Sequence, residues 1–245
     1  MTTKSGTAKR AATTGAAPIP IVALDFPSAE AALSMVETLG GSCRFYKVGS
    51  ELFTAAGPQI VEALSAIGND VFLDLKLHDI PNTVRAAARS AAALGVRLLT
   101  VHASGGRAMI EAAIEGAGDR CGVLGVTVLT SLDAASLRKA WGRNTLDLSR
   151  ETLRLAGDCA AAGAHGVVCS GLEAKKIRAE YGPELRLLIP GIRAAGGKRD
   201  DQRRTVTPAE AAKAGATYMV LGRMVTQASD PRGALESAMM VALGA

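Results

Sequence analysis

The chain has 245 residues, 48% of them hydrophobic and 21% charged, which is the balance of a globular protein, and we expect a single domain. No uncharged apolar stretch approaches the ~18–20 residues of a membrane-spanning helix, which excludes a membrane protein, and an aromatic content of 3% disfavours the stacking surfaces of single-strand nucleic-acid binders. The net charge of +5 comes from dispersed basic residues and suits a small anionic ligand as well as a polymer.

The first 17 residues are small and polar and contain no apolar core of a secretory signal. We expect residues 1–17 to be a disordered tail and residues 18–245 to form the folded domain. The four cysteines lie far apart in the sequence, with no CxxC pair and no zinc-site spacing. They are expected to be buried, reduced thiols in a cytosolic protein.

Eight short apolar runs follow in chain order, as expected of strands covered on both faces. They span residues 19–25, 44–49, 70–76, 97–103, 122–129, 166–170, 186–191 and 218–222. Ala-rich amphipathic segments, which we expect to be helices, alternate with them at residues 28–40, 83–95, 106–118, 153–163 and 208–215. The first five runs start about 25 residues apart, which fits one strand, one helix and two loops. Eight such units predict an α/β fold, the (β/α)8 TIM barrel.

An open doubly wound sheet is the alternative architecture, but no glycine fingerprint follows the first strand after Asp25. Two connections, residues 130–151 and 192–207, are longer than the rest. We expect a short helix in the first. In a barrel both would stand at the carboxyl ends of the strands, where active sites lie and long loops can serve as lids.

Charged residues interrupt the third strand. Side chains alternate along a strand, so Asp74 and Lys76 share the face toward the barrel mouth, while the neighbouring leucines point toward the helices. One interpretation is a structural ion pair, with Asp79 capping the next helix, which Pro81 introduces. The other is a functional site, because charges in a mostly buried strand are costly unless they are used.

Neighbouring strands carry similar groups: Asp25 closes the first strand and Lys47 lies near the end of the second. In a barrel these two residues would join Asp74 and Lys76 at one end of the lumen, with Asp79 just above. Alternating signs give each charge an opposite neighbour, so we expect all of them to be ionised. Such an array is a preorganised electrostatic device.

The eighth strand ends in Gly222 and Arg223, where this fold commonly binds phosphate. The preceding long loop contributes further polar and basic residues: Arg193, Lys198, Arg199, Gln202, Arg203 and Arg204. Some of them could close on a phosphate, although most are expected to be solvated surface charges, and we single out Gln202 beside Arg223.

The three histidines, His78, His102 and His165, form no HxxxH pair and have no carboxylate set for a metal site, so none is predicted. Two interpretations stay open for His102, which either lines the site or is a hydrogen-bonded structural histidine. No GxSxG nucleophile motif occurs.

The segment DLKLHDIPNTV, residues 74–84, resembles the signature of the orotidine 5′-phosphate decarboxylase family. The resemblance covers nearly the whole chain from Ile21, with further matching segments in the family's order at residues 24–25, 45–58, 126–131, 190–193, 200–204 and 221–223. It implies a carboxy-lyase that makes UMP from orotidine 5′-phosphate, in the last step of de novo pyrimidine synthesis, without a metal or organic cofactor.

The resemblance also implies roles. Lys76 would be the catalytic lysine in a charged tetrad with Lys47, Asp74 and Asp79. The substrate-binding residues would be Asp25 and Lys47 at the ribose, Thr130 with Ser131 by the pyrimidine, Asp74 near the substrate carboxylate, and Arg193, Gln202, Gly222 and Arg223 at the 5′-phosphate. Asp79, Ile80 and Thr83 would reach the neighbouring subunit's site, which implies a homodimer with shared active sites, and the cysteines place it in the cytoplasm.

Two rival functions remain. A Mg²⁺-dependent sugar-phosphate decarboxylase or aldolase of the same barrel superfamily shares the DxKxxD pattern, but the HDIPNT continuation favours the metal-free enzyme. A basic nucleic-acid-binding protein would use the cluster at residues 193–204, but it would not need the buried charges in the first three strands. We therefore expect no nucleic acid and no membrane among the partners.

Overall fold

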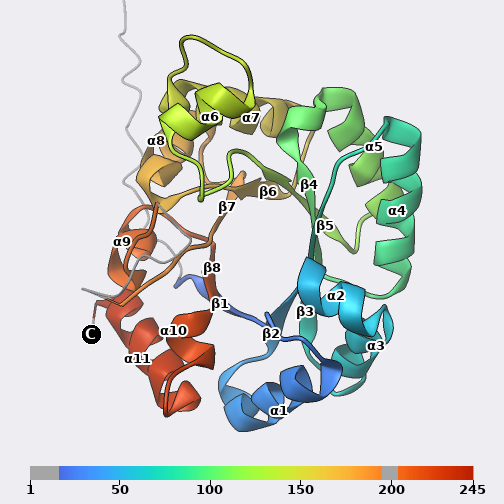
Figure 1. Ribbon diagram of the computed structural model, residues 1–245, viewed down its shortest axis with the longest axis vertical. Helices are drawn as coiled ribbons and strands as arrows, with labels where there is room; N and C mark the ends of the chain where they lie inside the picture. The colour runs from blue at the N-terminus through green and yellow to red at the C-terminus, as the bar shows by residue number, and fades with distance from the viewer. Residues whose placement is uncertain (1–16, 195–203, 245) are drawn as a thin grey trace, which may run out of the picture.

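A computed structural model describes residues 17–194 and 204–244. Within them, eight parallel strands close into a barrel in chain order, with β8 beside β1 (Figure 1). The strands are β1 (Ile19–Ala23), β2 (Phe45–Gly49), β3 (Asp70–Leu77), β4 (Leu98–His102), β5 (Gly122–Val126), β6 (Gly166–Val168), β7 (Arg186–Ile189) and β8 (Tyr218–Leu221). The predicted TIM barrel is confirmed, and the open doubly wound sheet is excluded.

Helices surround the barrel (Figure 1). They are α1 (Ala29–Leu39), α2 (Ser50–Ala56), α3 (Gln59–Ala66), α4 (Pro81–Ala93), α5 (Arg107–Ala117), α6 (Ala134–Ala140), α7 (Leu148–Ala161), α8 (Gly171–Tyr181), α9 (Pro208–Lys213), α10 (Arg223–Thr226) and α11 (Pro231–Leu243). All five predicted helices are present. The start of α7 lies before the predicted Leu153, because the Asp147 side chain accepts a hydrogen bond from the Arg150 N–H and caps the helix there.

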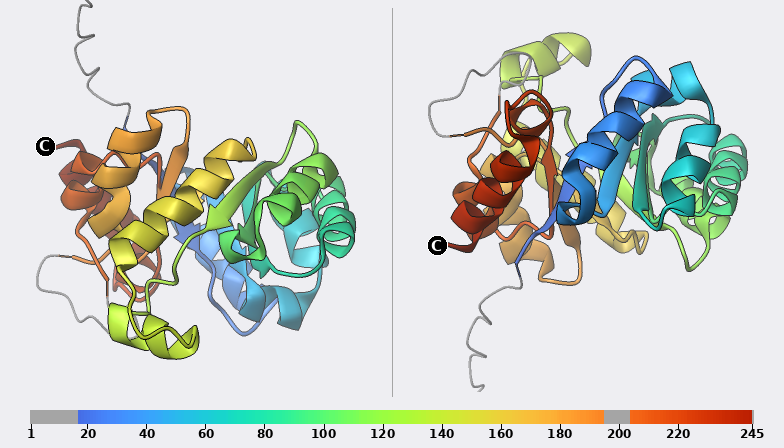
Figure 2. Two further views of the ribbon diagram at one scale, coloured as in Figure 1. Left: turned by 90° about the horizontal axis from the view of Figure 1, so that it is seen from above. Right: turned by 90° about the horizontal axis from the view of Figure 1, so that it is seen from below.

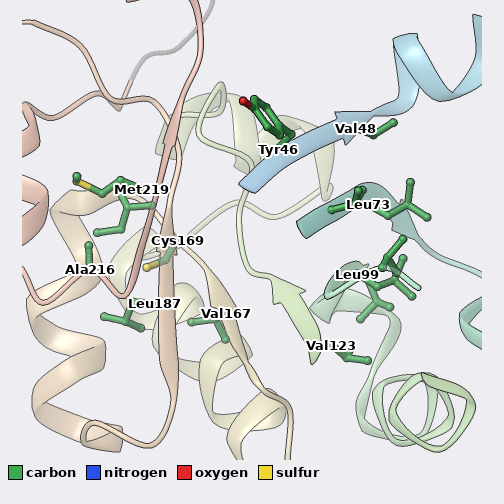
Figure 3. Close-up of a cluster of buried hydrophobic side chains, with 14 of the residues drawn as sticks. Tyr46, Val48, Leu73, Leu99, Val123, Val167, Cys169, Leu187, Ala216 and Met219 are labelled. Carbon is green, nitrogen blue, oxygen red and sulfur yellow. The ribbon is translucent and has the colours of Figure 1, made fainter. Parts of the chain in front are cut away.

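Strand alternation divides the apolar side chains into two layers. Outward-facing residues pack against the helices, and Figure 3 labels several of them, including Tyr46, Leu73 and Met219. Inward-facing residues fill the lumen: Ile21, Ala23, Phe45, Phe72, Leu98, Leu124, Val126, Val168, Leu188, Tyr218 and Val220. The lumen is therefore a packed apolar floor, and polar side chains can enter only at its ends.

The long connection after β5 contains the expected short helix, α6, which stands off from the other helices at one end of the barrel (Figure 2). The connection after β7 is described only at its two ends, and residues 195–203 lie outside the described ranges. The predicted tail likewise lies outside them, apart from Ala17.

All four cysteines are free and buried, as predicted. Burial raises the pKa of Cys121 to about 11, so its thiol is neutral near pH 7. None of the helices in the described part of the chain is both long and apolar enough to cross a membrane.

Candidate active site

A cavity of about 660 Å³ opens at the carboxyl end of the barrel. Its walls are strand ends and the loops that follow β1, β5, β7 and β8. Most of the residues singled out from the sequence line it: Asp25, Lys47, Asp74, Lys76, Thr130, Ser131, Arg193, Gly222 and Arg223. Gln202 lies outside the described residues. The structure thus brings together side chains from six strand ends that are up to 198 positions apart in the sequence.

Four of these residues form a chain of ion pairs with alternating signs. The Lys47 ammonium lies 2.6 Å from Oδ1 of Asp25 and 3.9 Å from Oδ2 of Asp74. The Lys76 ammonium lies 2.8 Å from the same Oδ2 of Asp74. Asp74 therefore sits between two cations, as the alternation predicts. Its side chain is 13% exposed and that of Lys76 is 34% exposed, so the Lys76 ammonium is the more accessible to a ligand.

Lys76 has an unusual backbone conformation for a residue with a side chain. Its φ angle is +51°, and it is the one non-glycine residue with positive φ in the described ranges. This left-handed conformation costs on the order of 1–2 kcal/mol relative to the usual regions. It coincides with a break in register between β3 and β4, between Leu73 and Leu77. The bulge redirects the strand end and turns the Lys76 side chain into the cavity.

Thr100 on β4 stabilises this bulge. Its hydroxyl accepts a hydrogen bond from the Lys76 backbone N–H at 2.9 Å and donates one to Oδ1 of Asp74 at 2.9 Å. The Thr100 side chain is fully buried. One hydroxyl therefore takes the place of a regular ladder partner for Lys76 and also orients the carboxylate that holds the Lys76 ammonium.

The opposite side of the cavity carries donors suited to an anion. Arg223 begins α10 directly after Gly222, and Arg193 follows β7. The Nη1 of Arg193 donates to the carbonyl of Ile192, whereas its Nε is buried with no hydrogen-bond partner among the described residues. Thr130 is 8% exposed and lies in the wall that follows β5.

Asp79, Ile80 and Thr83 do not line this cavity. They are exposed at the beginning of α4, where Ile80 has 66% of its surface accessible. The Asp79 carboxylate accepts a hydrogen bond from the N–H of Ile80, which is itself the N-cap, and not from an N–H within the helix. The interpretation of Asp79 as a helix cap is therefore wrong. Asp79 is exposed and lies outside the lining of this cavity.

Comparisons with a family model, with related sequences and with solved structures all point to the same family. The model of the orotidine 5′-phosphate decarboxylase / HUMPS family matches residues 18–238. The chain is 50% identical over 212 residues to an orotidine 5′-phosphate decarboxylase of Anaeromyxobacter sp. (strain K), covering 86% of this chain and 92% of that protein. A crystal structure of orotidine 5′-phosphate decarboxylase from Lactobacillus acidophilus superimposes with a TM-score of 0.82 at 38% identity, over 93% of this chain and 99% of that one.

The chain belongs to the orotidine 5′-phosphate decarboxylase / HUMPS family. The resemblance stated from the segment at residues 74–84 is confirmed. A decarboxylase of Cutibacterium acnes, 49% identical over 214 residues, supports the same assignment.

Sequence reasoning missed several residues of this family member's site. Thr100 looks like an ordinary β-branched strand residue, and only its place opposite the bulge reveals its role. Gly49 lies in the matching segment at residues 45–58, where the sequence gives no reason for a glycine, yet a Cβ there would lie 2.8 Å from the Lys47 Nζ and 3.3 Å from Oδ1 of Asp25. Glu51 on α2 and Gln227 after α10 also line the cavity. Their exposed, polar positions gave no signal in the sequence.

His102 does not line the cavity. Its ring packs against that of His78, with 5.3 Å between the ring centroids. Burial, followed by the nearby His78 and Lys76, lowers the pKa of His102, so this imidazole is neutral near pH 7. His102 therefore has a structural role, as one of the two interpretations proposed. The observed contact is ring packing against His78 and not the hydrogen bond that was expected.

The two hydrogen bonds of the Thr100 hydroxyl, here called the Thr100 relay, can be tested by measuring the free energy of unfolding. Thr100→Val keeps the shape but leaves the Lys76 N–H and Oδ1 of Asp74 without this partner, so we expect the free energy of unfolding to fall by about 1–3 kcal/mol. Thr100→Ser keeps the hydroxyl and should lose less than ~1 kcal/mol, the value of one buried methyl group. Urea denaturation of the three proteins measures both effects. Equal stability of Thr100→Val and the wild type would contradict the relay.

Proposed function

We propose that this protein decarboxylates orotidine 5′-phosphate to UMP, the last step of de novo UMP synthesis, without a metal or organic cofactor. One observation carries the proposal: a lysine ammonium held 2.8 Å from a buried carboxylate inside a cavity whose far side offers arginines. The 50% identity to an orotidine 5′-phosphate decarboxylase over 86% of the chain supports the choice of substrate.

The reaction needs a fixed positive charge. When the bond between C6 and the carboxylate breaks, CO2 leaves and the electron pair stays on C6 in an orbital in the ring plane, where the π-system cannot delocalise it. The Lys76 ammonium stabilises this carbanion and then donates a proton to C6, and the neutral amine regains a proton from water. Asp74 and Thr100 hold Lys76 in place beforehand, so little reorganisation is needed in the transition state.

The other lining residues bind the parts of the substrate that do not react. Asp25 and Lys47 hold the ribose hydroxyls, and Thr130 with Ser131 contacts the pyrimidine edge. Gly222 and Arg223, together with Gln202 and Arg193, bind the 5′-phosphate, whose two negative charges suit guanidinium donors. The binding energy of this remote phosphate contributes to positioning C6 against Lys76.

A Mg²⁺-dependent sugar-phosphate enzyme of the same superfamily would need carboxylates that are available to a cation. Asp25 and Asp74, the aspartates that line the cavity, each have a lysine ammonium within 2.8 Å. No three His, Cys, Asp or Glu residues of the described segments are grouped to hold a metal ion. Two of the three described carboxylates that line the cavity are therefore engaged by lysines, Glu51 being the third, and this pairing favours the reaction that relies on Lys76.

The central experiment follows the loss of orotidine 5′-phosphate absorbance with and without EDTA. We expect activity that survives chelation and falls by about 10⁴-fold or more in Lys76→Ala, because this variant loses both charge stabilisation and the proton donor. Lys176→Ala is the matched control, since that residue is exposed and its ammonium donates to the Ser149 hydroxyl, away from the cavity. Inactive wild-type protein, or activity abolished by EDTA, would contradict the proposal.

We also propose a cytoplasmic homodimer with shared sites. Four buried free cysteines suit a reducing compartment. Asp79, Ile80 and Thr83 are exposed at the rim of the barrel end that carries the cavity, and the carboxylate completes the tetrad of the other subunit. This arrangement explains why an acidic residue so near Lys76 in sequence lies outside its own cavity.

Sharing can be tested by mixing two inactive variants. Each homodimer of Lys76→Ala or Asp79→Asn lacks one essential group in both sites. A mixed dimer has one intact site, so equal mixing after subunit exchange should restore about a quarter of the wild-type activity by random pairing. Activity that stays at the level of the separate variants would show that Asp79 does not serve a partner's site.

Gly49 gives a second test of the charged array. The Cβ of Gly49→Ala would displace the Lys47 ammonium from Asp25, so we expect KM for orotidine 5′-phosphate to rise by about tenfold, the equivalent of about 1.4 kcal/mol of ribose binding. Gly41→Ala is the control, because nothing lies within 4 Å of a Cβ built there. Steady-state kinetics of both variants measure the effect. An unchanged KM in Gly49→Ala would argue against close packing of Gly49 against the Lys47 ammonium.

A further inference from the structure

Arg204 is not the solvated loop charge that the sequence suggested. It is the first described residue after position 203, in the connection between β7 and α9, and it is only 6% exposed. It does not line the cavity. A buried guanidinium this close to a functional site is costly unless its donors are used, so its contacts show what it does.

The first set of contacts goes to the wall that follows β5. The Nη2 of Arg204 donates to the carbonyls of Val128 and Leu129, at 2.9 and 3.0 Å. The Arg204 backbone N–H donates to the carbonyl of Thr130 at 3.3 Å. Residues 128–130, here called the β5 wall, are all cavity-lining residues. Arg204 therefore donates hydrogen bonds to three consecutive carbonyls of the β5 wall without itself lining the cavity.

The second contact goes to helix α8. The Nη1 of Arg204 lies 2.9 Å from Oε2 of Glu173, and both side chains are less than 10% exposed. Glu173 stands in the first turn of α8, which Ser170 caps. An ion pair this buried is costly to break from one side, because the remaining charge keeps its desolvation penalty. Glu173 thus gives the guanidinium a second anchor, on helix α8.

The residues that follow Arg204 form hydrogen bonds with the β7 side of the cavity. Two residues further on, the Val206 N–H donates to the carbonyl of Gly191 at 3.3 Å, and the Arg193 N–H donates to the carbonyl of Val206 at 3.0 Å. Gly191 and Arg193 line the cavity on the β7 side. Residues 204–206 therefore connect the β5 wall to the segment that carries Arg193.

We propose that Arg204, with Glu173, is a positioning residue that sets the β5 wall, and hence Thr130, relative to the β7 side of the cavity. Arginine suits this role because its planar guanidinium can donate to two carbonyls through Nη2 while its positive charge pairs with a carboxylate beside Nη1. The inference rests on the proposed function only for its kinetic readout.

The chain offers a matched control at the other end of α8. Arg178 is also partly buried and donates to backbone carbonyls, those of Gly182, Leu185 and Gly215, at 2.7, 3.1 and 2.8 Å. These carbonyls precede β7 and β8, at the end of the barrel away from the cavity. Arg178→Met therefore removes a partly buried arginine with similar carbonyl contacts without touching either wall.

The experiment compares Arg204→Met with Arg178→Met in the whole protein. Hydrogen–deuterium exchange without ligand should become faster at residues 127–133 in Arg204→Met and stay at the wild-type rate there in Arg178→Met. The kcat/KM for orotidine 5′-phosphate should fall about 10- to 100-fold in Arg204→Met, as expected for a misplaced wall. In Arg178→Met it should stay within about twofold, the normal scatter of a distant change.

Conservative variants keep the test decisive if Arg204→Met folds poorly. Arg204→Lys keeps the charge near Glu173 but not the fork, so it should recover part of the lost activity. Glu173→Gln should also speed exchange at residues 127–133. Unchanged exchange there in Arg204→Met, Arg204→Lys and Glu173→Gln would overturn the inference. Inactive wild-type protein would overturn the proposed function alone, because the exchange comparison needs no substrate.

Discussion

The site depends on the carboxylate of Asp74, which lies between two ammonium groups. Its Oδ2 pairs with Lys76 at 2.8 Å and lies 3.9 Å from Lys47, and its Oδ1 accepts the Thr100 hydroxyl. Two lysines and two aspartates bring the formal charge of the array to zero, so these charges can be kept at the end of an apolar lumen at tolerable cost. Removing any one of them would leave the array with one unbalanced charge.

Barrel closure makes this array possible. In a parallel barrel, strand ends from distant parts of the chain meet at one rim, and alternation directs every second side chain inward. Below the rim, Phe45 and Phe72 occupy the inward positions of β2 and β3, whereas Lys47 and Asp74 occupy the next ones. The apolar layer beneath excludes water from one side, which strengthens the interaction of the charges above it with each other and with a ligand.

The pattern of the sequence predicted the barrel, its strands and the charged residues of β1 to β3, because periodicity and charge signs are local properties. It could not predict the role of Thr100. Its hydroxyl matters because it lies beside the bulge of β3, where the register shifts and Lys76 has a positive φ angle. The role of Gly49 becomes clear only from its distance to the Lys47 ammonium. The role of Arg204 becomes clear only from its burial, because in the sequence it is one of several basic residues in a row. Each of the three depends on contacts between segments far apart in the chain.

The two sides of the cavity are built differently, and this difference gives Arg204 its importance. Lys47 and Asp74 of the charged array stand at ladder-paired positions of β2 and β3, and the pairing of β3 with β4 resumes at Leu77 after the bulge. Thr130 and Arg193 stand on loops after β5 and β7, beyond the last ladder pairs of those strands. Rigid placement of a loop needs contacts from side chains or a neighbouring segment, because no ladder extends to it. The buried pair of Arg204 and Glu173 supplies such contacts for the β5 side, and residues 204–206 extend them to the β7 side.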